Sequence, residues 1–388
     1  MSEPLYGTPQ PHRPPLGPLS PLIDRSSTTA QPDAATLRAC GLAEQAGEFY
    51  QRLGHRNGRA FESAVAELEG AEGAVSFASG MGAMSAALGA LLSSGDRALV
   101  AEQVYGGTSA FATEDLPRFG VVVDRFSSVD LDALREQLVR PAKLVVFESP
   151  TNPTLRVADI GGVVELARSA GAVTVFDGTF SPPPIQRVLD LGVDLVVHSA
   201  TKFFGGHSDV LAGVVAGRRE HLDLIEGWRR RSGGILAPDS AWLLQRSWPT
   251  LGLRVAAQQA NALALARGLQ AERGAGSIVA VTYPGLEDHP DRALVERQMT
   301  GGGAVVTLEL AGGLPEVLRA LDRLQVIARG ASLGGVETLA TVPAFTTHAA
   351  CTPAQLEAAG IAPGLMRIAV GLEPVEELLE DVLQAIKG

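Results

Sequence analysis

Short apolar runs rich in β-branched residues alternate with helical patterns through residues 70–213 of this 388-residue chain. Several of these runs are continuously apolar rather than alternating, which is typical of strands that are buried on both faces of a parallel sheet. The candidate strands are residues 74–78, 98–101, 120–124, 143–148, 172–177, 194–199 and 210–216. The alternation predicts an α/β fold with a mostly parallel central sheet flanked by helices.

The pattern changes after residue 249. A long helical stretch over residues 255–272 precedes short candidate strands near 278–283 and 304–310 and amphipathic helices near 314–324 and 374–386. Residues 1–34 are rich in Pro and Ser and have no periodicity, which is typical of an extended arm that becomes ordered on another surface. We therefore predict an extended N-terminal arm over residues 1–50, a large α/β domain over 51–249 and a smaller α+β domain over 250–388.

Charge and composition argue against several classes of partner. A formal net charge of −11 at pH 7 repels nucleic acid and anionic membrane surfaces. No apolar run is long enough to span a bilayer and no signal-peptide pattern is present, so we expect a soluble cytoplasmic protein. Cys40 and Cys351 lie far apart and without metal-ligand spacing, so we expect neither a disulfide nor a bound metal.

Polar residues stand where several candidate strands end, and ligands bind at that edge of an open α/β sheet. Lys202 follows a buried strand, where burial or nearby cations lower the pKa of an amine and make it a nucleophile. The turn Ser79-Gly80-Met81-Gly82 precedes a helical run and offers N–H groups to a phosphate, with the hydroxyls of Ser199 and Thr201 as further donors. Asp177 ends a neighbouring strand, where its carboxylate can hold a proton on a ring nitrogen. An amine, a phosphate cradle and a carboxylate are together what pyridoxal phosphate requires.

Two other interpretations of these segments are weaker. Residues 80–85 read Gly-x-Gly-x-x-Ser, and with Glu102 at the next strand end they partly match a dinucleotide-binding fingerprint, but the usual third glycine or alanine is absent. His198, His207 and Asp209 suggest a metal cluster, but His198 lies on a buried strand. We expect both histidines to be structural.

The run VVHSATKFFGGHSDVLAG, residues 196–213, resembles the lysine signature of the Cys/Met-metabolism family of pyridoxal-phosphate enzymes. That family includes cystathionine γ-synthase, cystathionine γ-lyase, cystathionine β-lyase, methionine γ-lyase and O-acetylhomoserine sulfhydrylase. The resemblance implies a fold-type I transferase architecture, similar to aspartate aminotransferase, and a homotetramer.

The resemblance also implies roles for individual residues. Lys202 is expected to hold the cofactor as a Schiff base and then to act as general base, while Tyr105 stacks on the ring and assists proton transfer. Asp177 is the expected partner of the pyridinium nitrogen, and Arg367 the expected clamp on the substrate α-carboxylate. The other implied cofactor-binding residues are Tyr50 and Arg52, which reach the phosphate of a neighbouring subunit, and Ser79, Gly80, Met81, Asn152, Thr179, Ser199 and Thr201. The other implied substrate-binding residues are Asn152, Ser332 and Glu337, the last of which is expected to meet the distal amino group of cystathionine.

The expected reaction is γ-elimination or γ-replacement at a C–S or C–O bond of cystathionine or a homoserine-derived amino acid, in trans-sulfuration. Gly107 stands where methionine γ-lyases carry a cysteine, which favours a cystathionine γ-lyase or γ-synthase type. Methionine γ-lyase, O-acetylhomoserine sulfhydrylase and, more remotely, a non-catalytic pyridoxal-phosphate-binding regulator stay open as alternatives. The chain departs from the family pattern at His55-Arg56-Asn57, where Asn-Pro-Thr is usual, and at Gly178, where Asn is usual.

Overall fold

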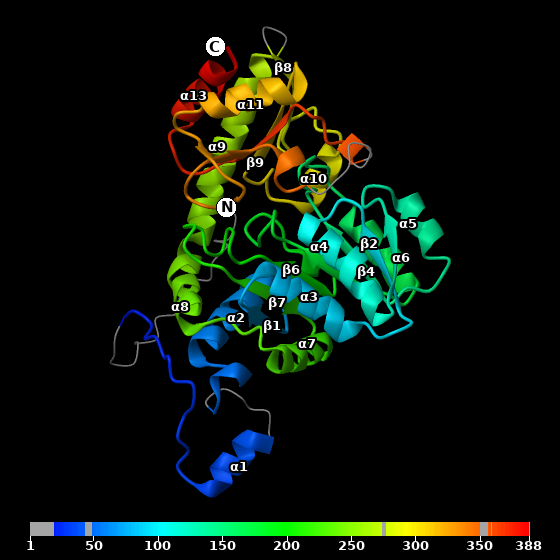
Figure 1. Cartoon of the computed structure of the whole chain (residues 1–388), viewed down its shortest axis with the longest axis vertical. Helices are drawn as coiled ribbons and strands as arrows, with labels where there is room; N and C mark the ends of the chain where they lie inside the picture. The colour runs from blue at the N-terminus through cyan, green and yellow to red at the C-terminus, as the bar shows by residue number, and fades with distance from the viewer. Residues whose placement is uncertain (1–18, 43–48, 274–276, 350–355, 358, 388) are drawn as a thin grey trace.

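A seven-stranded sheet forms the larger layer of the protein (Figure 1). The computed structural model describes residues 19–42, 49–273, 277–349, 356–357 and 359–387. The strand order in the large sheet is β1-β7-β6-β5-β4-β2-β3, and β7 alone runs antiparallel to its neighbours β1 and β6. The strands are β1 (Gly73–Phe77), β2 (Arg97–Ala101), β3 (Val122–Phe126), β4 (Leu144–Glu148), β5 (Val173–Asp177), β6 (Leu195–His198) and β7 (Gly213–Gly217). The predicted mostly parallel sheet is confirmed.

Two strands begin two or three residues later than predicted, while the other strands of the large sheet agree to within one residue at each end. The strand predicted at residues 120–124 is β3 and begins at Val122, because Gly120 has φ 79° and ends the preceding 3-10 helix, Leu116–Phe119. The strand predicted at residues 210–216 is β7 and begins at Gly213, because Ala212 exchanges hydrogen bonds with the side chain of Thr201 and holds a loop there.

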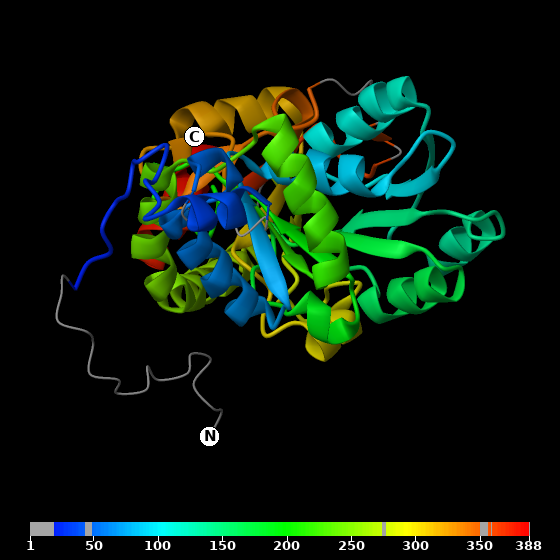
Figure 2. The same ribbon diagram turned by 90° about the horizontal axis from the view of Figure 1, so that it is seen from below.

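Helices cover both faces of the large sheet (Figure 2). Around it lie α2 (Arg56–Glu69), α3 (Gly80–Leu91), α4 (Gly106–Ala110), α5 (Leu131–Gln137), α6 (Ile160–Ser169), α7 (Arg219–Ser232) and α8 (Pro238–Ser247). His55 begins α2 as its N-cap: Nδ1 accepts from the Gly58 N–H at 3.1 Å, and Nε2 donates to the Leu236 carbonyl at 2.8 Å. One departure from the family pattern therefore has a structural role in this chain.

A second sheet of five strands, in the order β10-β11-β12-β9-β8, packs with helices above the large sheet in Figure 1. Its strands are β8 (Ile278–Thr282), β9 (Val305–Leu310), β10 (Ala328–Arg329), β11 (Leu339–Thr341) and β12 (Leu365–Ala369), and its helices are α9 (Leu251–Ala271), α10 (Arg292–Gln298), α11 (Gly313–Arg323) and α13 (Val375–Lys387). Helix α9 links the two apolar cores, since Val255 packs in the first and Leu265 in the second. The domain limits near residues 50 and 249 stay a prediction.

Residues 21–25 run along α8 of their own chain. The Trp242 indole donates to the Pro21 carbonyl at 2.8 Å, and Arg25 forms an ion pair with Asp239. The arm is not extended throughout: α1 (Ala34–Leu42) forms within it and lies away from both sheets at the bottom of Figure 1. Most of the Pro-rich segment, residues 1–18, lies outside the described residues, as does Cys351. Within the described part of the chain, no helix has the length and apolar character needed to cross a membrane.

Asp381 on α13 binds the loop that follows α11 through hydrogen bonds. Its buried carboxylate accepts the backbone N–H groups of Gln325, Val326 and Ile327 at 2.8–2.9 Å. Burial alone would raise the pKa of Asp381, but these donors outweigh it and the pKa is lowered. A lowered folded pKa means that the stabilisation is present above the unfolded pKa of about 3.9 and is lost as the pH falls through the folded value.

Asp381→Asn is therefore expected to lower the free energy of unfolding at pH 7 by about 2–3 kcal/mol, because an amide oxygen replaces a charged acceptor. Urea unfolding measured at pH 7 and at successively lower pH tests this, with exposed Asp322→Asn as the control. A mutant that loses stability as steeply with falling pH as the wild type would contradict the assignment.

Candidate active site

A cavity of about 430 Å³ opens at the carboxyl ends of β4, β5 and β6, between the large sheet and the smaller unit. Twelve of the residues predicted from the sequence line it: Ser79, Gly80, Met81, Tyr105, Asn152, Asp177, Thr179, Ser199, Thr201, Lys202, Ser332 and Arg367. Segments more than 250 positions apart in the chain thus meet around one space.

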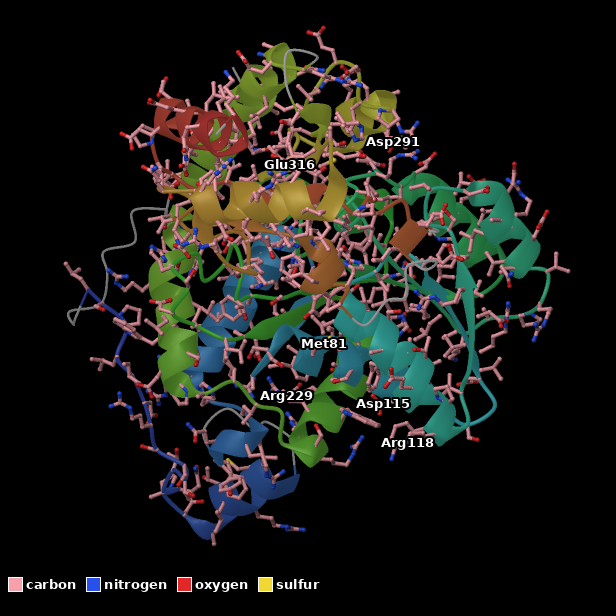
Figure 3. All side chains as sticks on the ribbon, turned by 45° about the horizontal axis from the view of Figure 1, so that its top comes forward. Met81, Asp115, Arg118, Arg229, Asp291 and Glu316 are labelled. Carbon is pink, nitrogen blue, oxygen red and sulfur yellow. The ribbon has the colours of Figure 1, made fainter. Side chains whose placement is uncertain are left out.

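The first turn of α3 forms one end of the cavity. Ser79 caps the helix by accepting the Gly82 N–H at 3.0 Å, and Met81, labelled in Figure 3, lies in the same turn. A Cβ on Gly80 would stand 2.7 Å from the Cβ of Ser199, so only glycine allows this turn and the loop after β6 to approach so closely. The helix N-terminus and the Ser199 hydroxyl suit a phosphate group.

Lys202 lies in the loop after β6. Its Nζ donates to Ser332 Oγ at 2.8 Å, which orients the amine across the cavity. Burial and then the nearby charge of Arg367 lower the pKa of Lys202. A larger fraction of neutral amine is therefore present at a given pH than for a free lysine, as a nucleophile or base requires.

Asp177 ends β5 and is partly open to the cavity. Its Oδ1 accepts the Thr179 N–H at 3.1 Å, and no cation is hydrogen-bonded to it among the residues that the structure describes. Burial raises the pKa of Asp177, while the Thr179 hydrogen bonds and the neighbouring His198 oppose the rise. The carboxylate of Asp177 thus has no hydrogen-bonded cation among the described residues, and the protonated nitrogen of a pyridine ring would supply one.

Arg367 projects from β12 and is buried. Nη1 donates to Asn152 Oδ1 at 2.9 Å and Nη2 to the Ser332 carbonyl at 3.1 Å, while Nε has no partner among the described atoms. Burial lowers the pKa of Arg367 to about 10, with Glu148 and Tyr105 opposing, so the guanidinium stays charged near neutrality. Among the residues that the structure describes, no carboxylate accepts a hydrogen bond from this guanidinium, which leaves its charge available to a ligand.

Three predicted site residues lie outside the cavity lining. Tyr50 is 40% exposed, and Arg52 lies over its ring and donates to the Arg230 carbonyl. Glu337 accepts a hydrogen bond from Ser208. Their predicted roles, in a neighbouring active site and at the distal end of the substrate, stay predictions.

The cavity is also lined by residues to which the sequence interpretation gave no role, which are Met84, Thr108, Glu148, Phe180, Val197, Leu211, Ala331, Leu333, Thr346 and Thr347. The sequence indicates a site position for Glu148, since this residue ends β4 in the same way as Asp177 ends β5. The sequence gives no such indication for Thr346 and Thr347, because they lie in a loop whose position depends on how the smaller unit packs. The backbone carbonyl of Thr347 stands 2.8 Å from where a Cβ on Gly106 would be, so this loop closes over the tyrosine turn.

The residues present fit pyridoxal phosphate. The start of α3 would hold its phosphate, Lys202 its aldehyde carbon and Asp177 its ring nitrogen. The fit rests on the close approach at Gly80 and on a carboxylate without a cationic partner.

Comparison with known proteins agrees with this geometry. Residues 8–387 match the model of the family described as Cys/Met metabolism PLP-dependent enzyme. The chain is 40% identical to L-methionine gamma-lyase of Pseudomonas putida, over 96% of this chain and 93% of that protein. It is 37% identical to cystathionine beta-lyase of Lactococcus lactis subsp. cremoris (strain MG1363), over 91% of this chain and 92% of that protein.

Among solved structures, cystathionine gamma synthase from Xanthomonas oryzae pv. oryzae in complex with cystathionine superposes with a TM-score of 0.89 and 37% identity, over 95% of this chain and 92% of that chain. The predicted fold-type I architecture, cofactor and enzyme class are confirmed. The chain belongs to the Cys/Met metabolism family of pyridoxal-phosphate-dependent enzymes, which act in trans-sulfuration as carbon–sulfur lyases and synthases.

Proposed function

We propose that this enzyme catalyses γ-elimination or γ-replacement at the C–S or C–O bond of cystathionine or a homoserine-derived amino acid. One observation carries the proposal: Ser332 contacts both Lys202, through its hydroxyl, and Arg367, through its carbonyl. The amine that moves protons and the cation that binds a carboxylate are therefore held at a fixed spacing beside one cavity. An α-amino acid anchored by its carboxylate at Arg367 would present its Cα to Lys202.

Each residue of the site has a separate role in the proposed reaction. When bound, pyridoxal phosphate supplies an electron sink for negative charge at Cα. Arg367 and Asn152 hold the α-carboxylate, and the neutral amine of Lys202 removes the proton from Cα. Expulsion of a γ-substituent also requires removal of a proton from Cβ, which a flexible lysine side chain can reach. Asp177 keeps the ring nitrogen protonated, and the exposed ring of Tyr105 covers the site.

Gly107 supports a cystathionine-type enzyme as the first choice. A Cβ on Gly107 would stand 2.7 Å from Cε1 of the Tyr105 ring and 3.0 Å from Sδ of Met81. The cysteine of methionine γ-lyases would therefore require this ring to move. In this proposal Glu337 pairs with the distal amino group of cystathionine.

A second candidate substrate is methionine, because part of the cavity lining is apolar. Leu211, Ala331 and Leu333 belong to that part, and the only carboxylates among the described lining residues are Glu148 and Asp177 at the strand ends. An S-methyl group suits such a wall. The 40% identity to an L-methionine gamma-lyase is in keeping with this alternative.

Product analysis separates these candidates. Purified enzyme is given cystathionine, methionine, homocysteine, or O-succinyl- or O-acetyl-homoserine with cysteine, side by side. We expect cysteine, 2-oxobutanoate and ammonia from cystathionine, or cystathionine from the O-acyl-homoserines, at a higher kcat/KM than the release of methanethiol from methionine. Methanethiol as the fastest product would favour the second candidate, and no turnover of any substrate would reject γ-carbon chemistry.

Glu337→Ala tests the predicted distal contact. Loss of a hydrogen bond to a charged group is expected to lower kcat/KM for cystathionine by roughly 10- to 100-fold, with less effect on methionine. Glu380→Ala, an exposed change on α13, is the control. Equal losses for the two substrates would reject the assigned role.

We also propose that the enzyme works in the cytoplasm as a homotetramer in which Tyr50 and Arg52 reach the phosphate of a neighbouring subunit. Their place outside the cavity of their own chain supports this. Mixed oligomers of Lys202→Ala and Arg52→Ala chains would contain some sites with both residues intact. Recovery of activity on mixing would support the proposal, and no recovery in demonstrably mixed oligomers would reject it.

A further inference from the structure

Glu148 is a buried carboxyl group that lines the cavity, and it has no role in the proposed reaction. It ends β4 and is 2% exposed. Oε2 accepts the backbone N–H of Tyr105 at 2.9 Å, while Oε1 has no hydrogen-bond partner in the described part of the chain. A buried polar atom without a partner, on a residue that lines a cavity, requires an explanation.

The sheet register brings Glu148 beside Asp177. Strands β4 and β5 are parallel neighbours, and Glu148 is the direct register partner of Asp177. Register partners on neighbouring strands project their side chains to the same face of a sheet, with the strands about 4.8 Å apart. Both side chains line the cavity. Two carboxylates this close in a buried space do not both ionise readily.

The surroundings decide which of the two keeps a proton. Burial and then the charge of Asp177 raise the pKa of Glu148 well above its usual range, and the Tyr105 and Asn152 N–H groups and Arg367 only oppose this. The Thr179 hydrogen bonds and the neighbouring His198 act to lower the pKa of Asp177. A protonated ring nitrogen would lower it further, because it would add a cation beside the carboxylate. Asp177 is therefore the group that ionises.

Other charged or titratable groups also face Glu148. Arg367 lies near it, but the hydrogen bonds of the guanidinium go to Asn152 and Ser332. A substrate carboxylate at Arg367 would further neutralise that charge. Tyr105 and Lys202 complete the titratable groups of the described lining, apart from Asp177.

We propose that Glu148 is a neutral carboxylic acid and a positioning residue of the active site. Its Oε2 holds the Tyr105 backbone beside the cavity, and its buried Oε1 carries the proton. Because it carries no charge, it does not compete with a substrate carboxylate for Arg367. This last part rests on the proposed function, whereas the protonation state does not.

Infrared difference spectroscopy of the purified holoenzyme without substrate tests the protonation state. The C=O stretch of a protonated carboxyl group is expected in the wild type and absent in Glu148→Gln. Glu62→Gln, which alters a partly buried glutamate paired with Arg229, is the control and is expected to keep the band. Absence of the band in the wild type, or its persistence in Glu148→Gln, would overturn the proposal whatever reaction the enzyme catalyses.

Kinetics of two variants test the positioning role. Glu148→Ala leaves the Tyr105 N–H without its acceptor and is expected to lower kcat/KM by roughly 10- to 100-fold. Glu148→Gln keeps a neutral acceptor, so its loss is expected to be at least about 10-fold smaller, with an unchanged pH profile. If Gln falls as far as Ala, the negative charge of Glu148 is required and the proposal fails.

Discussion

Lys202→Ala is expected to lower kcat by roughly 10³- to 10⁴-fold, because the variant loses the base that moves protons at Cα and Cβ. It also loses the amine that holds the cofactor. The amine of Lys202 lies 2.8 Å from Ser332 Oγ, and no other lysine lines the cavity among the described residues. Steady-state turnover of cystathionine and of methionine measures the effect.

The control for this prediction uses the chain's small number of lysines. The sequence contains three, Lys143, Lys202 and Lys387. Lys143→Ala removes an exposed amine just before β4 and is expected to keep wild-type turnover. Borohydride reduction of the enzyme loaded with pyridoxal phosphate, followed by peptide mapping, should place the label on Lys202. Full activity of Lys202→Ala, or a label on Lys143 or Lys387, would reject the assignment.

Arg367→Met is expected to lower kcat/KM by roughly 10²- to 10³-fold, because truncation of one member of a buried charge pair costs about 2–5 kcal/mol. The loss should appear mainly in KM if Arg367 binds the α-carboxylate equally in the ground state and the transition state. Arg329→Met, on strand β10 of the same sheet, removes an exposed guanidinium and is the control. Wild-type KM in Arg367→Met would contradict the clamp.

A second consequence of Arg367→Met concerns the pKa of Lys202. The charge of Arg367 contributes to the lowered pKa of Lys202, so its removal raises that pKa. A higher pKa means that the neutral amine appears only at higher pH. The rate at which apoenzyme takes up pyridoxal phosphate, followed by absorbance as a function of pH, should therefore shift its acid limb upward. A shift downward would show that Arg367 does not act on Lys202 by its charge.

Local pattern was sufficient to predict the large sheet and one side of the cavity. Strands β4, β5 and β6 are apolar at nearly every position because both of their faces are buried, and polar residues follow them where the burial ends. Lys202 and Asp177 were therefore recognisable in their predicted places. The shifted start of β3 has a local cause that hydropathy does not report, namely the left-handed conformation of Gly120.

The helix within the arm was not predicted. Helix α1 forms over Ala34–Leu42, where the expectation was an extended segment. The residues just before it read as an arm because Pro and Ser interrupt any periodicity, but the run from Ala34 consists mostly of good helix formers. Helix propensity explains why α1 forms, but it does not determine where α1 packs in an oligomer.

The sequence by itself determined the cofactor chemistry, through a helix N-terminus after β1, an aspartate at the end of β5 and a lysine after β6. Only the tertiary structure decided which distant groups face them. Arg367 reaches Lys202 because the smaller unit packs over the sheet and Ser332 contacts both, and Glu148 opposes Asp177 because β4 and β5 pair in register. The physical reason is that hydrophobic periodicity records which faces of a segment are buried, whereas the charge and protonation of a buried group depend on neighbours that only packing brings within a few ångströms.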